Sequence, residues 1–138
     1  MLNKEQKDKI KYLKQIKTLD KGIDRKIFEL EKWQTRSTNI TSVISDMPHG
    51  SNISDKIADC VANIADIDKE INECIDKYVD LKKVIEEKIN AFDDDRLKNI
   101  MLDKYINYWT WEEIAYRNNY SWQHVYRLHE QALNILNM

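Results

Sequence analysis

The sequence contains few of the residues on which turns depend. Its 138 residues include 2 glycines and 1 proline, well below the usage of ordinary globular proteins. Sheets and loop-built active sites need many turns, and turns rely on these residues. We therefore do not expect a β-barrel, a Rossmann fold or a glycine-rich nucleotide loop.

Cysteine and long apolar runs are also scarce. The 2 cysteines cannot form a disulfide scaffold. No apolar run exceeds a few residues, so neither a membrane-spanning helix nor a signal-peptide core is expected. These features predict a soluble, cytoplasmic protein without a membrane partner.

Charge is distributed unevenly along the chain. Residues 1–36 hold 11 Lys and Arg against 6 Asp and Glu, residues 37–93 hold 6 against 12, and residues 94–138 hold 5 against 6. A basic first segment beside an acidic second one favours pairing of two helices within the chain. A basic arm for nucleic acid is the weaker alternative.

Two long stretches repeat apolar residues every three or four positions, which is typical of helices that wrap around each other. The first runs from about Lys4 to Ile44, and the second from about Ser54 to Phe92. The second stretch has an apolar stripe wider than one partner helix needs. The apolar positions expected to face the partner helix are here called the seam. They are mainly Ile16, Leu19, Ile23, Leu30, Trp33, Ile40, Ile44, Ile57, Cys60, Ile64, Ile67, Ile71, Cys74, Tyr78, Leu81, Ile85 and Phe92.

The only proline lies between the two stretches, in Met47-Pro48-His49-Gly50. Proline ends a helix and glycine allows a turn, so this segment predicts an antiparallel helical hairpin. Because His49 has no second histidine beside it, we interpret it as a polar turn residue and not as a metal ligand.

Residues 93–138 have a different character, with short apolar repeats and many aromatic residues. Asp93–Asp95 can cap a helix that runs to about Ile106, and Thr110 with Glu113 forms a capping box. Asn119 can end the next helix in the left-handed conformation, and Ser121 can cap the last one. A short helix, a tight turn and a capped second helix predict a helix-turn-helix.

In a helix-turn-helix the second helix enters the major groove of DNA. The apolar face of the last helix is predicted to be Val125, Leu128, Ala132, Leu133 and Leu136. The opposite face offers glutamine, which suits adenine, and arginine, which suits guanine. The candidate DNA-binding residues are Ser121, Trp122, Gln123, His124, Tyr126, Arg127, Arg117 and Lys104. The plainer alternative is a three-helix packing unit in which aromatic residues such as Tyr105 and Trp111 form the core.

These residues resemble region four of bacterial sigma factors. The resemblance is carried by Leu102–Tyr105, Thr110–Ala115, Tyr120-Ser121, Val125, Leu128-His129 and Ala132-Leu133. With the Met47–Gly50 turn, the whole chain is similar to small phage regulators of the RinA and ArpU type. That pattern has a glycine in each turn where this chain has Tyr108-Trp109 and Asn119. The resemblance implies sequence-specific binding to double-stranded DNA, activation of late phage genes in a bacterial host cell, and contact with RNA polymerase.

The sequence therefore predicts an all-α protein with a long antiparallel hairpin over residues 1–92 and a three-helix helix-turn-helix over 93–138. We expect the hairpin to form a homodimer. The alternative function is a coiled-coil adaptor that binds RNA polymerase or a phage packaging component without binding DNA. His124 and His129 are five residues apart and do not share a helix face. No nucleophile or phosphate-loop motif occurs, so no enzyme activity, metal or cofactor is expected.

Overall fold

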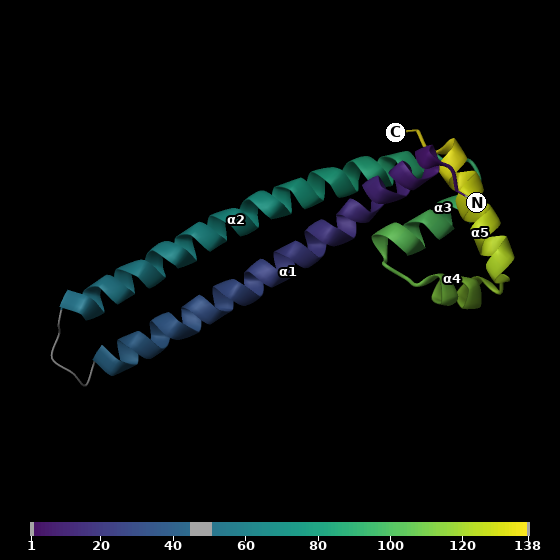
Figure 1. The fold of residues 1–138 in the computed structure, drawn as a ribbon. Coiled ribbons are helices and arrows are strands. Elements are labelled where there is room, and N and C mark those ends of the chain that lie inside the picture. Colours follow the sequence, from purple (N-terminus) through teal and green to yellow (C-terminus); the bar gives the residue numbers. More distant parts are fainter. Residues whose placement is uncertain (1, 45–50, 138) are drawn as a thin grey trace. The chain divides into compact units, whose positions relative to one another are not determined.

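The computed structural model describes residues 2–44 and 51–137, with side chains for 2–39 and 54–137. These residues form an all-α fold whose two long helices pack together (Figure 1). No strand occurs in these two ranges. The elements are α1 (Lys4–Ile44), α2 (Ser51–Asn90), α3 (Asp95–Met101), the π-helix η1 (Leu102–Ile106), α4 (Trp111–Asn118) and α5 (Trp122–Ile135).

The chain divides into two compact units. The first, here called the head, contains Met1–Leu19 and Tyr78–Met138, and the second, the arm, contains Asp20–Lys77. The boundary predicted at residue 92 therefore does not coincide with these units. The first turns of α1 and the last turns of α2 belong to the same unit as α3, η1, α4 and α5.

The arm buries the centre of the predicted seam. Ile23 of α1 and Cys60, Ile67 and Ile71 of α2 are buried, and the Lys26 ammonium lies 2.8 Å from the Glu70 carboxylate. Residues beside the seam are not covered in the same way. The arm residues with exposed large apolar side chains are Ile27, Phe28, Val61 and Ile75.

The predicted turn Met47–Gly50, with His49, lies outside the described residues, as do the side chains of Ile40 and Ile44. The second helix begins at Ser51, three residues before the predicted start at Ser54. Gly22 lies inside α1, and a Cβ atom added there would meet nothing within 4 Å. A close approach of another helix at Gly22 is therefore absent among the described residues.

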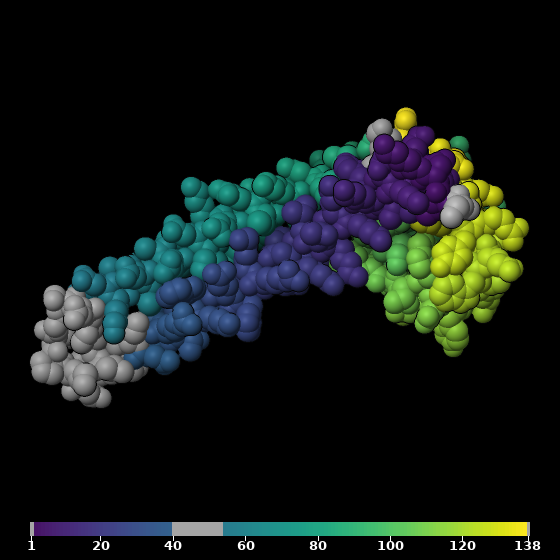
Figure 2. Space-filling view, in the orientation of Figure 1, coloured from purple at the N-terminus to yellow at the C-terminus, as the bar shows by residue number. Residues whose placement is uncertain are grey.

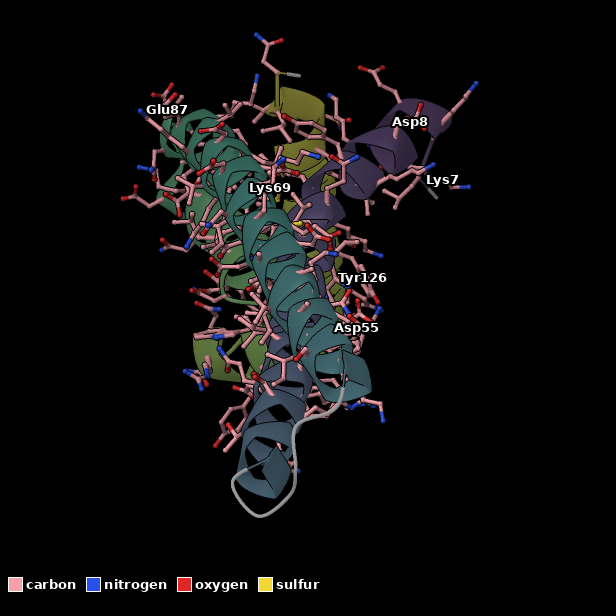
Figure 3. All side chains as sticks on the ribbon, turned by 90° about the vertical axis from the view of Figure 1, so that its left-hand side faces the viewer. Lys7, Asp8, Asp55, Lys69, Glu87 and Tyr126 are labelled. Atoms are coloured by element: carbon pink, nitrogen blue, oxygen red, sulfur yellow. The ribbon has the colours of Figure 1, made fainter. Side chains whose placement is uncertain are left out.

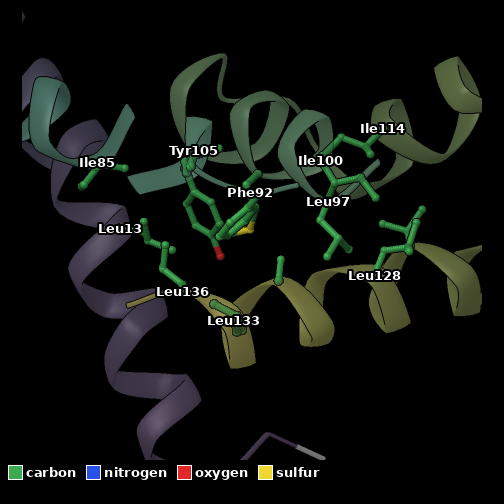
Figure 4. Close-up of a cluster of buried hydrophobic side chains, with 14 of the residues drawn as sticks. Leu13, Ile85, Phe92, Leu97, Ile100, Tyr105, Ile114, Leu128, Leu133 and Leu136 are labelled. Atoms are coloured by element: carbon green, nitrogen blue, oxygen red, sulfur yellow. The ribbon is translucent and has the colours of Figure 1, made fainter. Parts of the chain in front are cut away.

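The head has a continuous apolar core (Figure 4). Leu13 of α1 and Ile85 of α2 belong to this core, and Leu13 lies close to Leu136, just after α5. Burying one such aliphatic side chain stabilises a fold by about 1.5–3 kcal/mol. The buried members are Leu13, Ile16, Ile85, Ile89, Phe92, Leu97, Ile100, Met101, Tyr105, Ile114, Ala115, Val125, Leu128, Ala132, Leu133 and Leu136.

Polar contacts fix the C-terminal end of α5 within the head. The last carbonyl groups of a helix have no partner inside that helix. The Lys9 ammonium donates to the Leu133 carbonyl in the last turn of α5 at 2.8 Å, and the Lys88 ammonium donates to the carbonyl of Asn137, two residues beyond the helix, at 2.7 Å. Positive charge at this end also complements the helix dipole.

Both cysteines are free: Cys60 is buried and Cys74 is half-buried, as their spacing on one helix predicts. Among the described residues, no helix combines the length and the apolar character needed to cross a membrane.

Candidate nucleic-acid interface

Helix α4 begins at the predicted capping box. The Thr110 hydroxyl accepts a hydrogen bond from the Glu113 N–H at 3.1 Å. The Glu113 carboxylate reaches back and accepts from the Thr110 hydroxyl at 3.3 Å, whereas a full capping box would bind the Thr110 N–H.

The turn between α4 and α5 is closed by a left-handed residue. Asn119 has φ 56°, and the Tyr120 N–H donates to the Ala115 carbonyl at 2.9 Å. This six-residue closure is the Schellman arrangement of a helix C-terminus. The prediction that Asn119 ends the helix in this conformation is confirmed.

The turn before α4 also contains a residue in the left-handed conformation, and this residue is a tyrosine. Tyr108 has φ 61°, which in a residue with a Cβ atom costs about 1–2 kcal/mol. Both turns that flank α4 thus contain a residue with a positive φ, Tyr108 before the helix and Asn119 after it, and neither residue is glycine.

A π-helix precedes that turn and was not predicted. The sequence predicted one helix from the Asp93–Asp95 cap to about Ile106. Asp94 is the observed cap and accepts from the Arg96 N–H at 2.9 Å, but α3 ends at Met101. The chain then widens through η1, and the Asn107 N–H donates to the Leu102 carbonyl at 2.9 Å. Such widened turns occur frequently at functional sites.

Helix α5 has one buried and one open face. Ser121 caps it as predicted, since its hydroxyl accepts from the His124 N–H at 3.2 Å. The predicted apolar face is buried throughout: Val125, Leu128, Ala132, Leu133 and Leu136. On the other side Gln123 and Arg127 are exposed, and so are Trp122 at 46% and Tyr126 at 49%.

The remaining candidate residues have different surroundings. Arg117 is exposed and its guanidinium lies 4.0 Å from the Trp109 ring centre. His124 is half-buried, with its ring edge-on to Tyr120 at 4.7 Å. Lys104 is half-buried, 4.7 Å from the Trp111 ring centre, and its ammonium donates to the Trp109 carbonyl at 3.4 Å.

The position of Lys104 affects its charge. Burial, and then the nearby Lys14 and Lys17, lower the pKa of the Lys104 ammonium. Lys104 therefore does not extend freely from the helix-turn-helix, as a lysine on an open surface would. It belongs to a group of cations contributed by η1 and α1.

A cavity of about 370 Å³ separates these cations from α5. It is amphipathic, with aliphatic and aromatic walls and three charged side chains. Its lining residues are Leu2, Ile10, Lys14, Lys104, Tyr105, Trp111, Tyr126, His129 and Glu130. The cavity places Lys14 of α1 beside the same part of α5 that exposes Tyr126.

The inner wall of this cavity contains a polar pair that the prediction did not include. His129 is only 4% exposed, and its Nε2 atom lies 2.8 Å from the Tyr105 hydroxyl. Burial, and to a lesser degree Lys104 and Lys14, lowers the pKa of His129 to about 4, so His129 is neutral at pH 7. The spacing of Val125, Leu128 and Ala132 places residue 129 on their face, and this signal could have identified it.

The head is more basic than the helix-turn-helix segment alone. Residues 94–138 carry a net charge of −1, whereas the whole head has fourteen Lys and Arg against twelve Asp and Glu, which gives +2. Six of those lysines lie in residues 4–17. The net positive charge of the head thus comes from the first turns of α1.

The described ranges, 2–44 and 51–137, contain no cluster of three or more His, Cys, Asp or Glu residues that could hold a metal ion. Comparisons with protein-family models, curated proteins and solved structures find no match for this chain. The geometry of the head therefore carries the functional interpretation.

Proposed function

We propose that the protein is a sequence-specific DNA-binding regulator of transcription and that α5 is its recognition helix. The open face of α5 is the observation that carries this proposal. Gln123 and Arg127 are exposed near its capped start while the opposite face is fully buried. A helix held in this way can enter the major groove without unfolding any part of the head.

Each candidate residue has a definite role in this proposal. Gln123 pairs with adenine and Arg127 with guanine through two hydrogen bonds each. The free N–H groups at the start of α5, next to Ser121, bind a phosphate oxygen. Arg117, already stacked on Trp109, contacts the DNA backbone. The rings of Trp122 and Tyr126, whose centres lie 5.8 Å apart, make apolar contacts with the groove wall.

The experiment is a selection of duplexes from a random library by the purified chain, followed by binding measurements on the selected site. We expect Arg127→Ala and Gln123→Ala to reduce discrimination at one base pair each by about 1–3 kcal/mol. Gln131→Ala is the matched control, because Gln131 is exposed on the same helix but lies nearer its C-terminal end. If the wild-type chain selects no sequence, the proposal is wrong.

The arm supports a second part of the proposal, a homodimer that sets two heads at a fixed spacing. Phe28 is 60% exposed and Val61 57% exposed, and such apolar side chains favour a protein partner when they lie close together. Light scattering should show a dimer at micromolar concentration, and Phe28→Glu with Val61→Glu should shift it toward the monomer. A wild-type monomer at high concentration would contradict this part alone.

The same exposed residues favour one alternative function. In it, the protein is an adaptor that binds RNA polymerase or a phage packaging component and does not bind DNA. Capture of polymerase by the full chain without any DNA shift would favour the adaptor. Activation of late phage genes in the host cytoplasm and contact with polymerase remain proposals that rest on the sigma-like and RinA/ArpU-like resemblance.

A further inference from the structure

Four lysines follow one side of the first turns of α1. Lys7, Lys11, Lys14 and Lys17 are spaced by four, three and three residues, so they lie along one helix face over about 15 Å. All four are exposed, and Figure 3 shows Lys7 projecting outward from the first turns of α1. Together with Lys104 of η1 they are here called the lysine ridge.

Three observations place the part of the ridge formed by Lys14, Lys17 and Lys104 beside the helix-turn-helix within the head. The Lys17 ammonium lies 5.8 Å from the Tyr108 ring centre, in the turn before α4. Lys14 and Lys104 line one cavity with Tyr126 of α5. In Figure 2 the surface of the first turns of α1, in purple, adjoins that of α5, in yellow.

The ion pairs found among the described side chains involve Lys9, Lys26, Lys82, Arg96 and Lys98, and none of the five ridge lysines. Glu130 is the acidic residue that lines the shared cavity. Like charges that gather on one surface repel each other, and a polyanion relieves this repulsion.

We propose that the lysine ridge binds the phosphate backbone of the DNA that flanks the base pairs read by α5. This proposal rests on the DNA-binding function proposed above. Lysines act as point charges that position a protein on DNA without reading sequence. A ridge of about 15 Å spans roughly four base pairs at 3.4 Å each. The ridge thereby supplies the basic surface that residues 94–138 lack.

The test removes four ridge charges, with Lys7, Lys11, Lys14 and Lys17 all changed to Gln in the full chain. The control removes four charges from exposed arm positions, with Lys21, Lys56, Lys69 and Lys77 changed to Gln. Both variants have the same net charge, so a difference between them reports position. Affinity for the selected duplex and for an unrelated duplex is measured between about 50 and 200 mM salt.

For the ridge variant we expect affinity for both duplexes to fall by a similar factor, about tenfold or more at low salt. The slope of log affinity against log salt should become shallower by about 0.9 for each phosphate that a ridge lysine no longer neutralises, or about 3–4 in total. The arm control should keep the wild-type slope. Changing the same four lysines to Arg should restore affinity and slope, which separates the removal of charge from a failure to fold.

Two results overturn the proposal while leaving DNA binding intact. One is a ridge variant whose slope equals that of the arm control, and the other is a ridge variant that loses sequence preference instead of general affinity. Absence of salt-dependent binding by the wild-type chain would instead overturn the proposed function and, with it, this inference.

Discussion

The head and the arm share the same two long helices, yet different interactions hold them. In the head, these helices bury Leu13, Ile16, Ile85 and Ile89 against further helices. Lysine side chains also donate hydrogen bonds to carbonyl groups at and just after the end of α5. In the arm, the helices have only each other among the described residues, and large apolar side chains remain exposed. A repeat of apolar residues is therefore enough to form both regions, but it does not show which part has additional partners.

The two units also differ in charge. The head carries +2, and the arm, with eight Lys and Arg against twelve Asp and Glu, carries −4. Under the proposals above, the basic unit meets DNA and the acidic unit meets protein. An acidic arm is repelled by the phosphate backbone, which favours engagement of DNA through the head alone.

The largest expected difference between the units is in the cost of a core deletion. Leu133 has no exposed surface, whereas Ile67 of the arm retains 6%. We expect Leu133→Ala to lower the free energy of unfolding by about 3–4 kcal/mol and Ile67→Ala by about 2 kcal/mol. Urea unfolding followed by circular dichroism measures both. Equal decreases would show that the arm is packed as completely as the head.

Acid should destabilise the head through His129. Its pKa is about 4 in the folded chain and 6.5 ordinarily, so the unfolded chain binds the extra proton first as pH falls. The contribution of His129 is fully present above about pH 6.5 and is lost progressively down to about pH 4, at roughly 1.4 kcal/mol per pH unit. The total decrease is about 3–4 kcal/mol.

Urea unfolding between pH 4 and pH 7 tests this expectation, with His129→Gln as the comparison. This variant should flatten the stability profile in that pH window. If the wild type and the variant lose stability in parallel, another group is responsible for the acid sensitivity.

Replacing serine with alanine should change the free energy of unfolding in opposite directions at a helix cap and inside a helix. Ser121 caps α5, so Ser121→Ala should lower the free energy of unfolding by about 1 kcal/mol. Ser54 lies inside α2 and is exposed, so Ser54→Ala should raise it by a few tenths of a kcal/mol. Thermal unfolding of both variants provides the measurement. A stabilising Ser121→Ala would mean that the cap bond contributes little.

These examples show what local chemistry makes predictable. The side-chain oxygens that start α4 and α5 and the left-handed Asn119 follow from rules that involve four or five neighbouring residues, and all were predicted. The apolar face of α5 was predicted from its period. These features depend only on residues that are close together in the sequence, so a single sequence is sufficient to predict them.

The features that were missed depend on distant partners. The period of α1 is the same on both sides of Leu19, so it could not indicate that the first turns belong to the head. Tyr108 has none of the features that make a left-handed conformation easy, and η1 has no recognisable composition. The surroundings of Lys104 depend on Lys14, ninety residues earlier, and no local pattern predicts that contact.

The smallest expected effect tests whether the arm is complete by itself. Gly22 is helical, has no positive φ, and a Cβ atom there meets nothing. Gly22→Ala should therefore raise the free energy of unfolding by about 0.5–1 kcal/mol. Ala58→Gly, at an exposed position of α2, is the reciprocal control and should lower it by a similar amount. A Gly22→Ala variant that keeps its helix content but no longer dimerises would instead show that a second copy packs closely against this position, and the arm would then owe part of its stability to that partner.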